Sequence, residues 1–132
     1  MFLFDSDVLI DFLRGAEPVA KRVAFELEHA NVAVSAVTAF ELTAGAVSVR
    51  QRAAVETLLE ATPIVPVSAD VAMLAGKIFR ELKAAGQEIG MADCLIGATC
   101  VAQRLLLVTR NRKHFERIPG IKLTIMAADG RL

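Results

Sequence analysis

Short, wholly apolar runs alternate with longer amphipathic stretches along most of this 132-residue chain. The run at 1–4 (MFLF) carries no polar residue, and the runs at 32–34 (VAV) and 105–108 (LLLV) share this property. A strand that is apolar at every position is typical of a parallel sheet buried on both faces, whereas a sheet with one wet face alternates polar and apolar residues. The alternation of such strands with helices therefore predicts an α/β fold.

Further strands and helices complete this alternation. Apolar segments at 63–67 and 121–125 are expected to add two strands, the first at a sheet edge because prolines interrupt it. The spacing of apolar residues predicts helices after the caps Ser35 and Ser68 and over 7–14, 18–29, 36–47, 50–60, 91–103 and 112–116. Together these elements predict a mostly parallel sheet of about five strands, with the ligand site beyond the carboxyl ends of the strands.

The composition excludes several classes of protein. Lys and Arg total 15 and Asp and Glu total 15, so no overall positive charge attracts nucleic acid. No apolar run approaches the roughly 18 residues of a membrane helix, and Asp5 lies too early for a secretory leader. Cys94 and Cys100 fall on different faces of one expected helix, which excludes a paired zinc or redox motif. We expect one domain over residues 1–132, cytoplasmic, without membrane association and with reduced thiols.

Three acidic residues interrupt segments that are otherwise apolar. Asp5 directly follows the first strand, while Glu41 and Asp93 are each the only charged residue within their expected helices. Each also has an ordinary structural explanation: turn chemistry for Asp5, solvation for Glu41 and the helix dipole for Asp93. For the neighbouring Asp7, capping of the next helix is the preferred interpretation.

No lysine or arginine within the same elements can neutralise these three carboxylates locally. Ionised carboxylates are seldom buried without a partner, because their desolvation is costly. A shared divalent cation explains all three acids, and ligation by oxygen suits Mg²⁺ or Mn²⁺. Zinc is disfavoured, because the only histidines are His29 and His114 and the thiols are misplaced.

A basic segment follows the expected strand at 105–108. Residues 110–117 (RNRKHFER) contain four basic residues and one acid, and they should reach the same edge of the sheet. In isolation such a segment is typical of a solvated helix face. Next to an acidic metal site, Arg110, Arg112 and Lys113 would hold the phosphates of a substrate.

Four segments resemble the PIN domain, and more narrowly the VapC-type toxins of prokaryotic toxin–antitoxin pairs. In family order they are LFDSDVLID, SAVTAFELTAG, MADCLIGATC and LLLVTRNRKHFERIPGIKL. The resemblance implies a three-layer α/β/α fold and an Mg²⁺- or Mn²⁺-dependent endoribonuclease that hydrolyses RNA phosphodiester bonds. It also implies a homodimer, and inhibition by a cognate VapB-like antitoxin that contacts the early helices, with Leu9, Phe12 and Leu13 as anchors.

The conserved acids of that family correspond to Asp5, Glu41 and Asp93, so the resemblance implies that these residues bind the metal and carry catalysis. Asp5 and Asp93 would be direct ligands, and Glu41 would bind the ion or orient the attacking water. The frequent fourth acid of the family aligns with His114, and Asn111 is also uncharged, so a second metal site lacks its usual acid. Polar residues that would support the ligands or orient a water are Asp7, Thr109, Asn111 and His114.

Two other functions remain open from the sequence. The FLFDSDV segment also fits a haloacid-dehalogenase-like phosphatase, in which Asp5 is the nucleophile and Asp7 the general acid. That family needs a late pair of adjacent acids, and none occurs near Asp93. The second alternative is a binding protein that keeps the fold without the chemistry, which would agree with the missing fourth acid.

Overall fold

The computed structural model describes residues 1–132 and contains one sheet of five parallel strands. In spatial order they are β3 (Ile64–Val65), β2 (Val32–Ser35), β1 (Phe2–Phe4), β4 (Leu106–Thr109) and β5 (Lys122–Ile125). The predicted α/β class and the predicted parallel sheet are therefore confirmed. The proline-flanked strand β3 lies at an edge, as its composition predicts, because proline has no N–H group to donate to a neighbouring strand.

Seven helices connect and flank the strands. They are α1 (Ser6–Leu13), α2 (Val19–Glu28), α3 (Ala36–Gly45), α4 (Val49–Glu60), α5 (Ala69–Ala84), α6 (Met91–Gln103) and α7 (Arg112–Phe115). Ser35 caps α3 by accepting a hydrogen bond from the Thr38 N–H at 2.9 Å, and Ser68 caps α5 by accepting one from the Val71 N–H at 3.2 Å. Both caps agree with the sequence-based prediction, whereas α3 ends earlier than expected.

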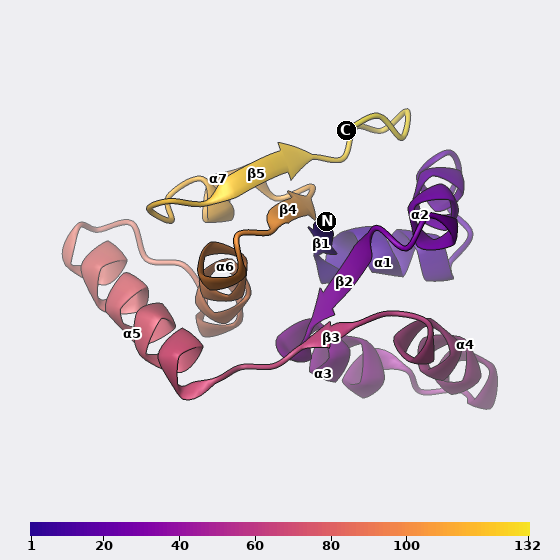
Figure 1. Cartoon of the computed structure of the whole chain (residues 1–132), viewed down its shortest axis with the longest axis horizontal. Helices are drawn as coiled ribbons and strands as arrows, with labels where there is room; N and C mark the ends of the chain where they lie inside the picture. The colour runs from indigo at the N-terminus through magenta and orange to yellow at the C-terminus, as the bar shows by residue number, and fades with distance from the viewer.

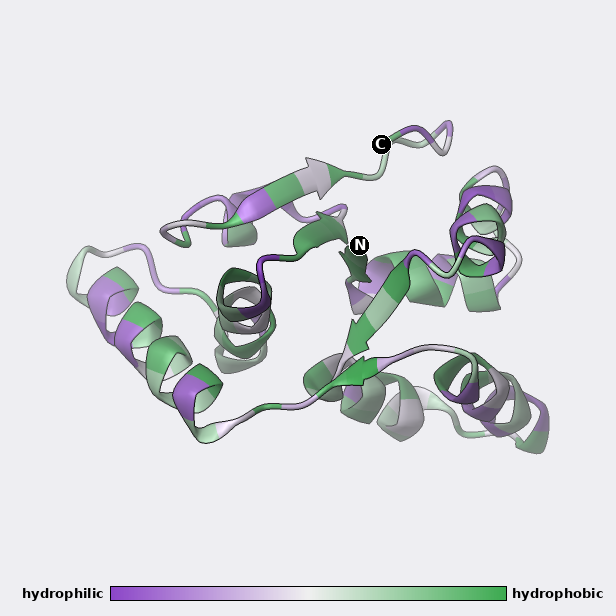
Figure 2. Cartoon of the chain, viewed as in Figure 1, coloured by the Kyte–Doolittle hydropathy of each residue, from purple (hydrophilic) through white to green (hydrophobic).

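The helices cover both faces of the sheet, which gives the molecule three layers (Figure 1). Along β1, Leu3 points to the face covered by α5 and α6, and Phe4 points to the face covered by α1, α2 and α4. Leu107 and Val108 alternate in the same way along β4. All four side chains are fully buried, and Figure 2 shows β1 and β4 as hydrophobic strands at the centre of the molecule.

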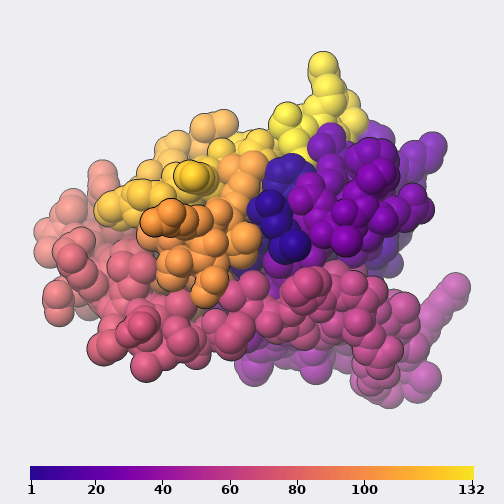
Figure 3. Space-filling model, viewed as in Figure 1, coloured from indigo at the N-terminus to yellow at the C-terminus, as the bar shows by residue number.

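The amino ends of the parallel strands lie at one edge of the sheet. In Figure 3 the start of the chain lies at the surface between the segments coloured as α2 and as the end of α6. Because all the strands are parallel, their carboxyl ends meet at the opposite edge of the sheet. No helix is both long enough and apolar enough to cross a bilayer.

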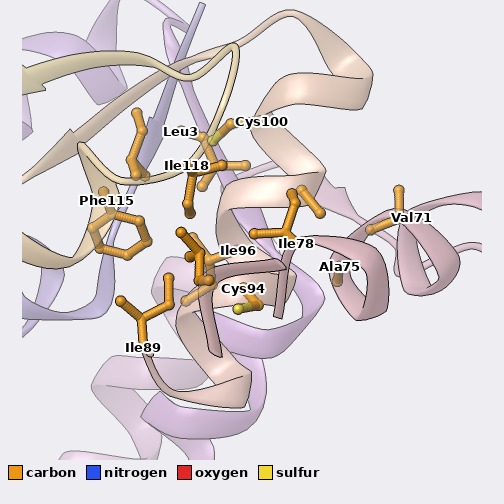
Figure 4. Packing of buried hydrophobic residues seen from close by; sticks show 13 residues of the cluster. Leu3, Val71, Ala75, Ile78, Ile89, Cys94, Ile96, Cys100, Phe115 and Ile118 are labelled. Carbon is orange, nitrogen blue, oxygen red and sulfur yellow. The ribbon is translucent and has the colours of Figure 1, made fainter. Parts of the chain in front are cut away.

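Helix α6 contacts the connection between α7 and β5 through a glycine. A Cβ atom built on Gly97 would overlap the Cδ1 atom of Ile118, whereas the Cγ1 and Cγ2 atoms of Ile118 would lie at 3.6 and 3.7 Å. Ile118 belongs to the core cluster in Figure 4, beside Phe115 and Ile96. The glycine therefore satisfies a packing requirement, although glycine costs an α-helix about 1 kcal/mol relative to alanine.

This packing predicts a compensating pair of substitutions. Gly97→Ala alone should lower the free energy of unfolding by about 1–3 kcal/mol, because the buried Ile118 must move. Ile118→Val alone should lower it by about 0.5–1.5 kcal/mol. In the Ile118→Val protein the overlapping methyl group is gone, so adding Gly97→Ala should leave stability unchanged or raise it. Urea denaturation of the four proteins measures this, and strictly additive losses would contradict the packing argument.

Candidate functional site

The carboxyl ends of β1 and β4 lie side by side and present Asp5 and Thr109. The Asp5 N–H donates to the Val108 carbonyl at 2.9 Å, which extends the pairing of the two strands. The Thr109 hydroxyl donates to Asp5 Oδ2 at 2.8 Å. Only 6% of Asp5 is exposed, so its carboxylate is held at the end of the sheet and is largely shielded from solvent.

Asp5 also begins helix α1. It is the N-cap residue, and its Oδ1 accepts a hydrogen bond from the Ser6 N–H at 2.8 Å. The interpretation that Asp7 caps this helix is wrong, because Asp7 lies inside the first turn. The extended backbone that β1 imposes on Asp5 is the conformation that an N-cap needs, so the strand end and the helix start share one residue.

Asp7 connects α1 to the segment after β4. Its Oδ1 accepts from the Val8 N–H at 2.7 Å, and its Oδ2 accepts from the Arg110 N–H at 3.0 Å and the Thr109 hydroxyl at 3.3 Å. The Arg110 guanidinium reaches back to Asp11 Oδ2 at 2.9 Å. Asp11 is not among the residues expected from the sequence, although its spacing of four from Asp7 places both on one face of α1.

Glu41 is half-buried on α3 and has an oxygen without a partner. Its Oε1 atom is buried and forms no hydrogen bond. Burial raises the pKa of Glu41 above its ordinary value; the Ser6 side chain opposes this rise, and the negative charge of Asp93 adds to it. The three residues involved, Ser6, Glu41 and Asp93, come from α1, α3 and α6. A buried carboxylate in this state is costly unless a cation or a proton compensates its charge.

Asp93 lies in the first turn of α6 and contacts the segment after β4. Its Oδ2 lies 2.8 Å from His114 Nδ1, and the Asn111 Nδ2 lies 2.8 Å from the same ring nitrogen. The Asn111 N–H in turn donates to the Thr109 hydroxyl oxygen at 3.0 Å. Since Thr109 donates to Asp5, the last residue of β4 and the segment after it together contact both of the acids expected to be direct ligands.

Negative charge gathers at this edge without a compensating lysine or arginine. Burial raises the pKa of Asp5 to about 6, and the charges of Asp7 and Asp93 act in the same direction, opposed by the hydrogen bonds to its oxygens. None of the ion pairs in the structure joins a lysine or arginine to Asp5, Glu41 or Asp93. The structure thus brings the three predicted acids to one edge of the sheet and leaves their charge largely unpaired.

The donors at this edge are carboxylate oxygens, which suit a hard divalent cation. No three His, Cys, Asp or Glu side chains are gathered closely enough to surround a metal ion by themselves. Mg²⁺ does not need such a cage, because it usually binds one or two carboxylates and keeps several waters. The buried oxygen of Glu41, which has no protein partner, and the raised pKa of Asp5 both fit a cation held in this way.

Of the three basic residues expected to bind phosphate, one forms an ion pair within the protein and two do not. The guanidinium of Arg110 is paired with Asp11, and 47% of the Arg110 side chain is exposed. Arg112 and Lys113 lie exposed on α7 and belong to none of the ion pairs. Of the three predicted phosphate ligands, these two remain free to bind an anion.

A groove of about 450 Å³ opens beside Glu41, between α1, α3 and α4. Its apolar lining includes Leu13, one of the expected partner anchors. Leu9 is fully buried in the core, so its expected role as an anchor is wrong. Phe12 is partly buried and packs against the same core. The periodicity of α1 could not separate these residues, because the helix packs against both the sheet and α2.

Comparison with known proteins gives the family. The model of the PIN domain matches residues 2–121. Ribonuclease VapC19 of Mycobacterium tuberculosis is 33% identical over 124 residues, which cover 92% of this chain and 98% of that protein. Ribonuclease VapC1 of Methanocaldococcus jannaschii is also 33% identical, over 93% of this chain and 85% of that protein.

A solved structure agrees with these matches. A chain in the crystal structure of DNA-bound VapBC from Salmonella typhimurium superposes with a TM-score of 0.81 at 27% identity, covering 94% of this chain and 96% of that chain. The match to the PIN domain over most of the sequence removes the phosphatase alternative. The chain belongs to the PIN-domain family, in the group of the VapC ribonucleases.

Proposed function

We propose that this chain is a divalent-metal-dependent endoribonuclease that hydrolyses RNA phosphodiester bonds. It acts as a toxin that a cognate VapB-like antitoxin inhibits. The observation that carries the proposal is the unpaired negative charge at the carboxyl edge of the sheet, where Asp5, Glu41 and Asp93 have no lysine or arginine partner. Charge of this kind is costly in the free protein and is compensated when Mg²⁺ or Mn²⁺ binds.

Asp5 and Asp93 would hold the cation, and Glu41 would hold it or accept a proton from the attacking water. A bound cation supplies Lewis-acid polarisation of the phosphodiester and makes water more acidic. Thr109 fixes Asp5 through its hydroxyl, and Asp7 fixes the backbone that carries Thr109. These hydrogen bonds hold the carboxylates in place before any ligand binds, which lowers the cost of reorganisation.

The substrate phosphates would lie against Arg112 and Lys113. Both are exposed on α7, which follows directly from the segment that contacts Asp5 and Asp93. Arg110 contributes differently, because its main chain binds Asp7 and its guanidinium neutralises Asp11. We therefore assign Arg110 to the support of the site and the other two cations to the RNA backbone.

An antitoxin helix would occupy the groove between α1, α3 and α4. The groove is largely apolar, and Glu41 lies in its wall, so a partner that fills it also reaches the catalytic edge. The Salmonella typhimurium structure is named as a VapBC complex, which supports a partner of this class. We further propose that the chain acts as a single domain over residues 1–132, forms a homodimer and works in the cytoplasm.

The sharpest test of catalysis is Glu41→Gln, which keeps the shape of the side chain and removes its charge. We expect cleavage of a structured RNA to fall by about 10²–10⁴-fold, as for the loss of a general base. The matched control is Glu56→Gln on the exposed face of α4, which should cleave at the wild-type rate. EDTA should abolish cleavage by the wild type, and added Mg²⁺ or Mn²⁺ should restore it.

The binding-protein alternative predicts a different result. In that case the purified wild type, freed of any partner, leaves RNA intact at millimolar Mg²⁺ and Mn²⁺, and Glu41→Gln changes nothing. Equal cleavage by wild type and Glu41→Gln would instead show that RNA hydrolysis does not use this edge of the sheet.

Asp5→Asn should separate stability from activity. Because the pKa of Asp5 is raised to about 6 in the folded protein from 3.8, the folded state binds more protons than the unfolded state between these values. In EDTA, this group should therefore lower the stability of the wild type as the pH rises from about 4 to about 7. Asp5→Asn should lack this loss and be more stable at pH 7.5, by on the order of 1–3 kcal/mol.

Denaturant titrations of both proteins at several pH values measure this difference, since groups remote from Asp5 titrate equally in the two. Mg²⁺ should stabilise the wild type and leave Asp5→Asn unchanged, while the variant loses RNA cleavage. A variant that is less stable than the wild type at pH 7.5 in EDTA would show that the Asp5 charge is already compensated within the protein.

The basic residues predict a change in salt dependence. Replacing Arg112 and Lys113 with alanine should weaken RNA binding and reduce the slope of log affinity against log salt by about 1.4, at roughly 0.7 for each phosphate contact on a single strand. Lys21→Ala on α2 is the control and should leave the slope unchanged. Filter binding with catalytically inactive protein gives the slopes of log affinity against log salt.

Arg110→Ala should chiefly reduce thermal stability, because it leaves Asp11 buried without a cation.

A further inference from the structure

A continuous set of polar contacts joins the two acids expected to be direct metal ligands. It runs from Asp5 to the Thr109 hydroxyl at 2.8 Å, from there to the Asn111 N–H at 3.0 Å, and through the Asn111 side chain to His114 at 2.8 Å. The last contact joins His114 Nδ1 to Asp93 Oδ2 at 2.8 Å. A segment of six residues, 109–114, therefore bridges the site.

The direction of the last contact follows from the chemistry of its two partners. An ionised carboxylate only accepts hydrogen bonds, so Nδ1 of His114 must carry a proton and donate it to Asp93. A protonated Nδ1 cannot accept a hydrogen bond, so the Asn111 amide that lies 2.8 Å from this nitrogen does not donate to it. His114 thus places a donor hydrogen against one oxygen of Asp93 and leaves the other oxygen free.

A second cation beside the first would need anionic ligands on this side of Asp93. In two-metal sites the ions lie about 3.5–4 Å apart and share ligands. Here the side of Asp93 that faces residues 109–114 carries the Nδ1–H group of His114, and residues 109–115 contain no acid. Asp7 forms no contact with Asp93 or His114, because its oxygens accept hydrogen bonds from the Val8 and Arg110 N–H groups and from the Thr109 hydroxyl. Asp11 is paired with Arg110.

We infer that the Nδ1–H group of His114 occupies the place where a second cation would bind Asp93. This site therefore holds one divalent ion. The inference rests on the proposed metal-dependent function and goes beyond it by fixing the number of ions. His114 is a positioning residue: it orients Asp93 toward the first ion and blocks a second. Asp93 Oδ1 and the unpartnered Oε1 of Glu41 would then be available, together with Asp5, to hold a single cation.

Counting bound Mn²⁺ tests this inference, because the count does not depend on turnover. The protein is titrated with Mn²⁺ alone, and free Mn²⁺ is measured by electron paramagnetic resonance. We expect one tight site in the wild type and two in His114→Asp, since the introduced carboxylate replaces the donor with an anionic ligand beside Asp93. His114→Asn keeps a donor at this position and should retain one site.

A control variant separates local geometry from added charge. His29→Asp places the same extra charge at the end of α2 and should still bind one Mn²⁺. Two ions bound to the wild type would overturn the inference and leave the proposed function standing. One ion in both the wild type and a folded His114→Asp would also overturn it, because His114 would not be what limits the number. No binding by the wild type would overturn the proposed function together with the inference.

Discussion

Unpaired carboxylates at the end of a buried sheet are the constraint on which the rest of this molecule depends. Asp5 is almost completely shielded from solvent, and Glu41 keeps a buried oxygen without a hydrogen bond. Both pKa values are raised for this reason, with Asp93 adding to each. The free protein therefore carries charge at one edge that is costly to bury, and the proposed divalent cation would compensate this charge.

The surrounding fold supplies the stability that this edge lacks. Strands β1 and β4 carry fully buried side chains to both faces of the sheet, and each face has its own apolar cluster. Rigid strands also fix where the polar groups begin, because Asp5 and Thr109 are the first polar residues beyond the apolar runs. The precision of the site thus comes from hydrophobic packing, while the hydrogen bonds of Thr109 and Asp7 set the final orientation.

Local signals made the fold and the three acids predictable from the sequence. Fully apolar runs predicted the central strands, prolines predicted the edge strand, and Ser35 and Ser68 predicted two helix starts. Glu41 and Asp93 stood out because each is the only charged residue in its expected helix, and Asp5 because it directly follows an apolar strand. The contacts of Asp11 with Arg110 and of Asp93 with His114 were not predictable, because each joins residues far apart in the sequence. The cap of α1 was misassigned to Asp7, since sequence alone does not show on which residue a strand ends.

The strand order also has a consequence for when the site can form. β4 inserts next to β1, so residues more than 100 positions apart are neighbours at the centre of the sheet. A growing polypeptide that has reached only α5 possesses Asp5 and Glu41 but neither Asp93 nor the segment that orients it. Such long-range pairing is slow to close. During synthesis on the ribosome, the acidic edge is therefore completed last, when residues 93–114 join the strand and helices made before them.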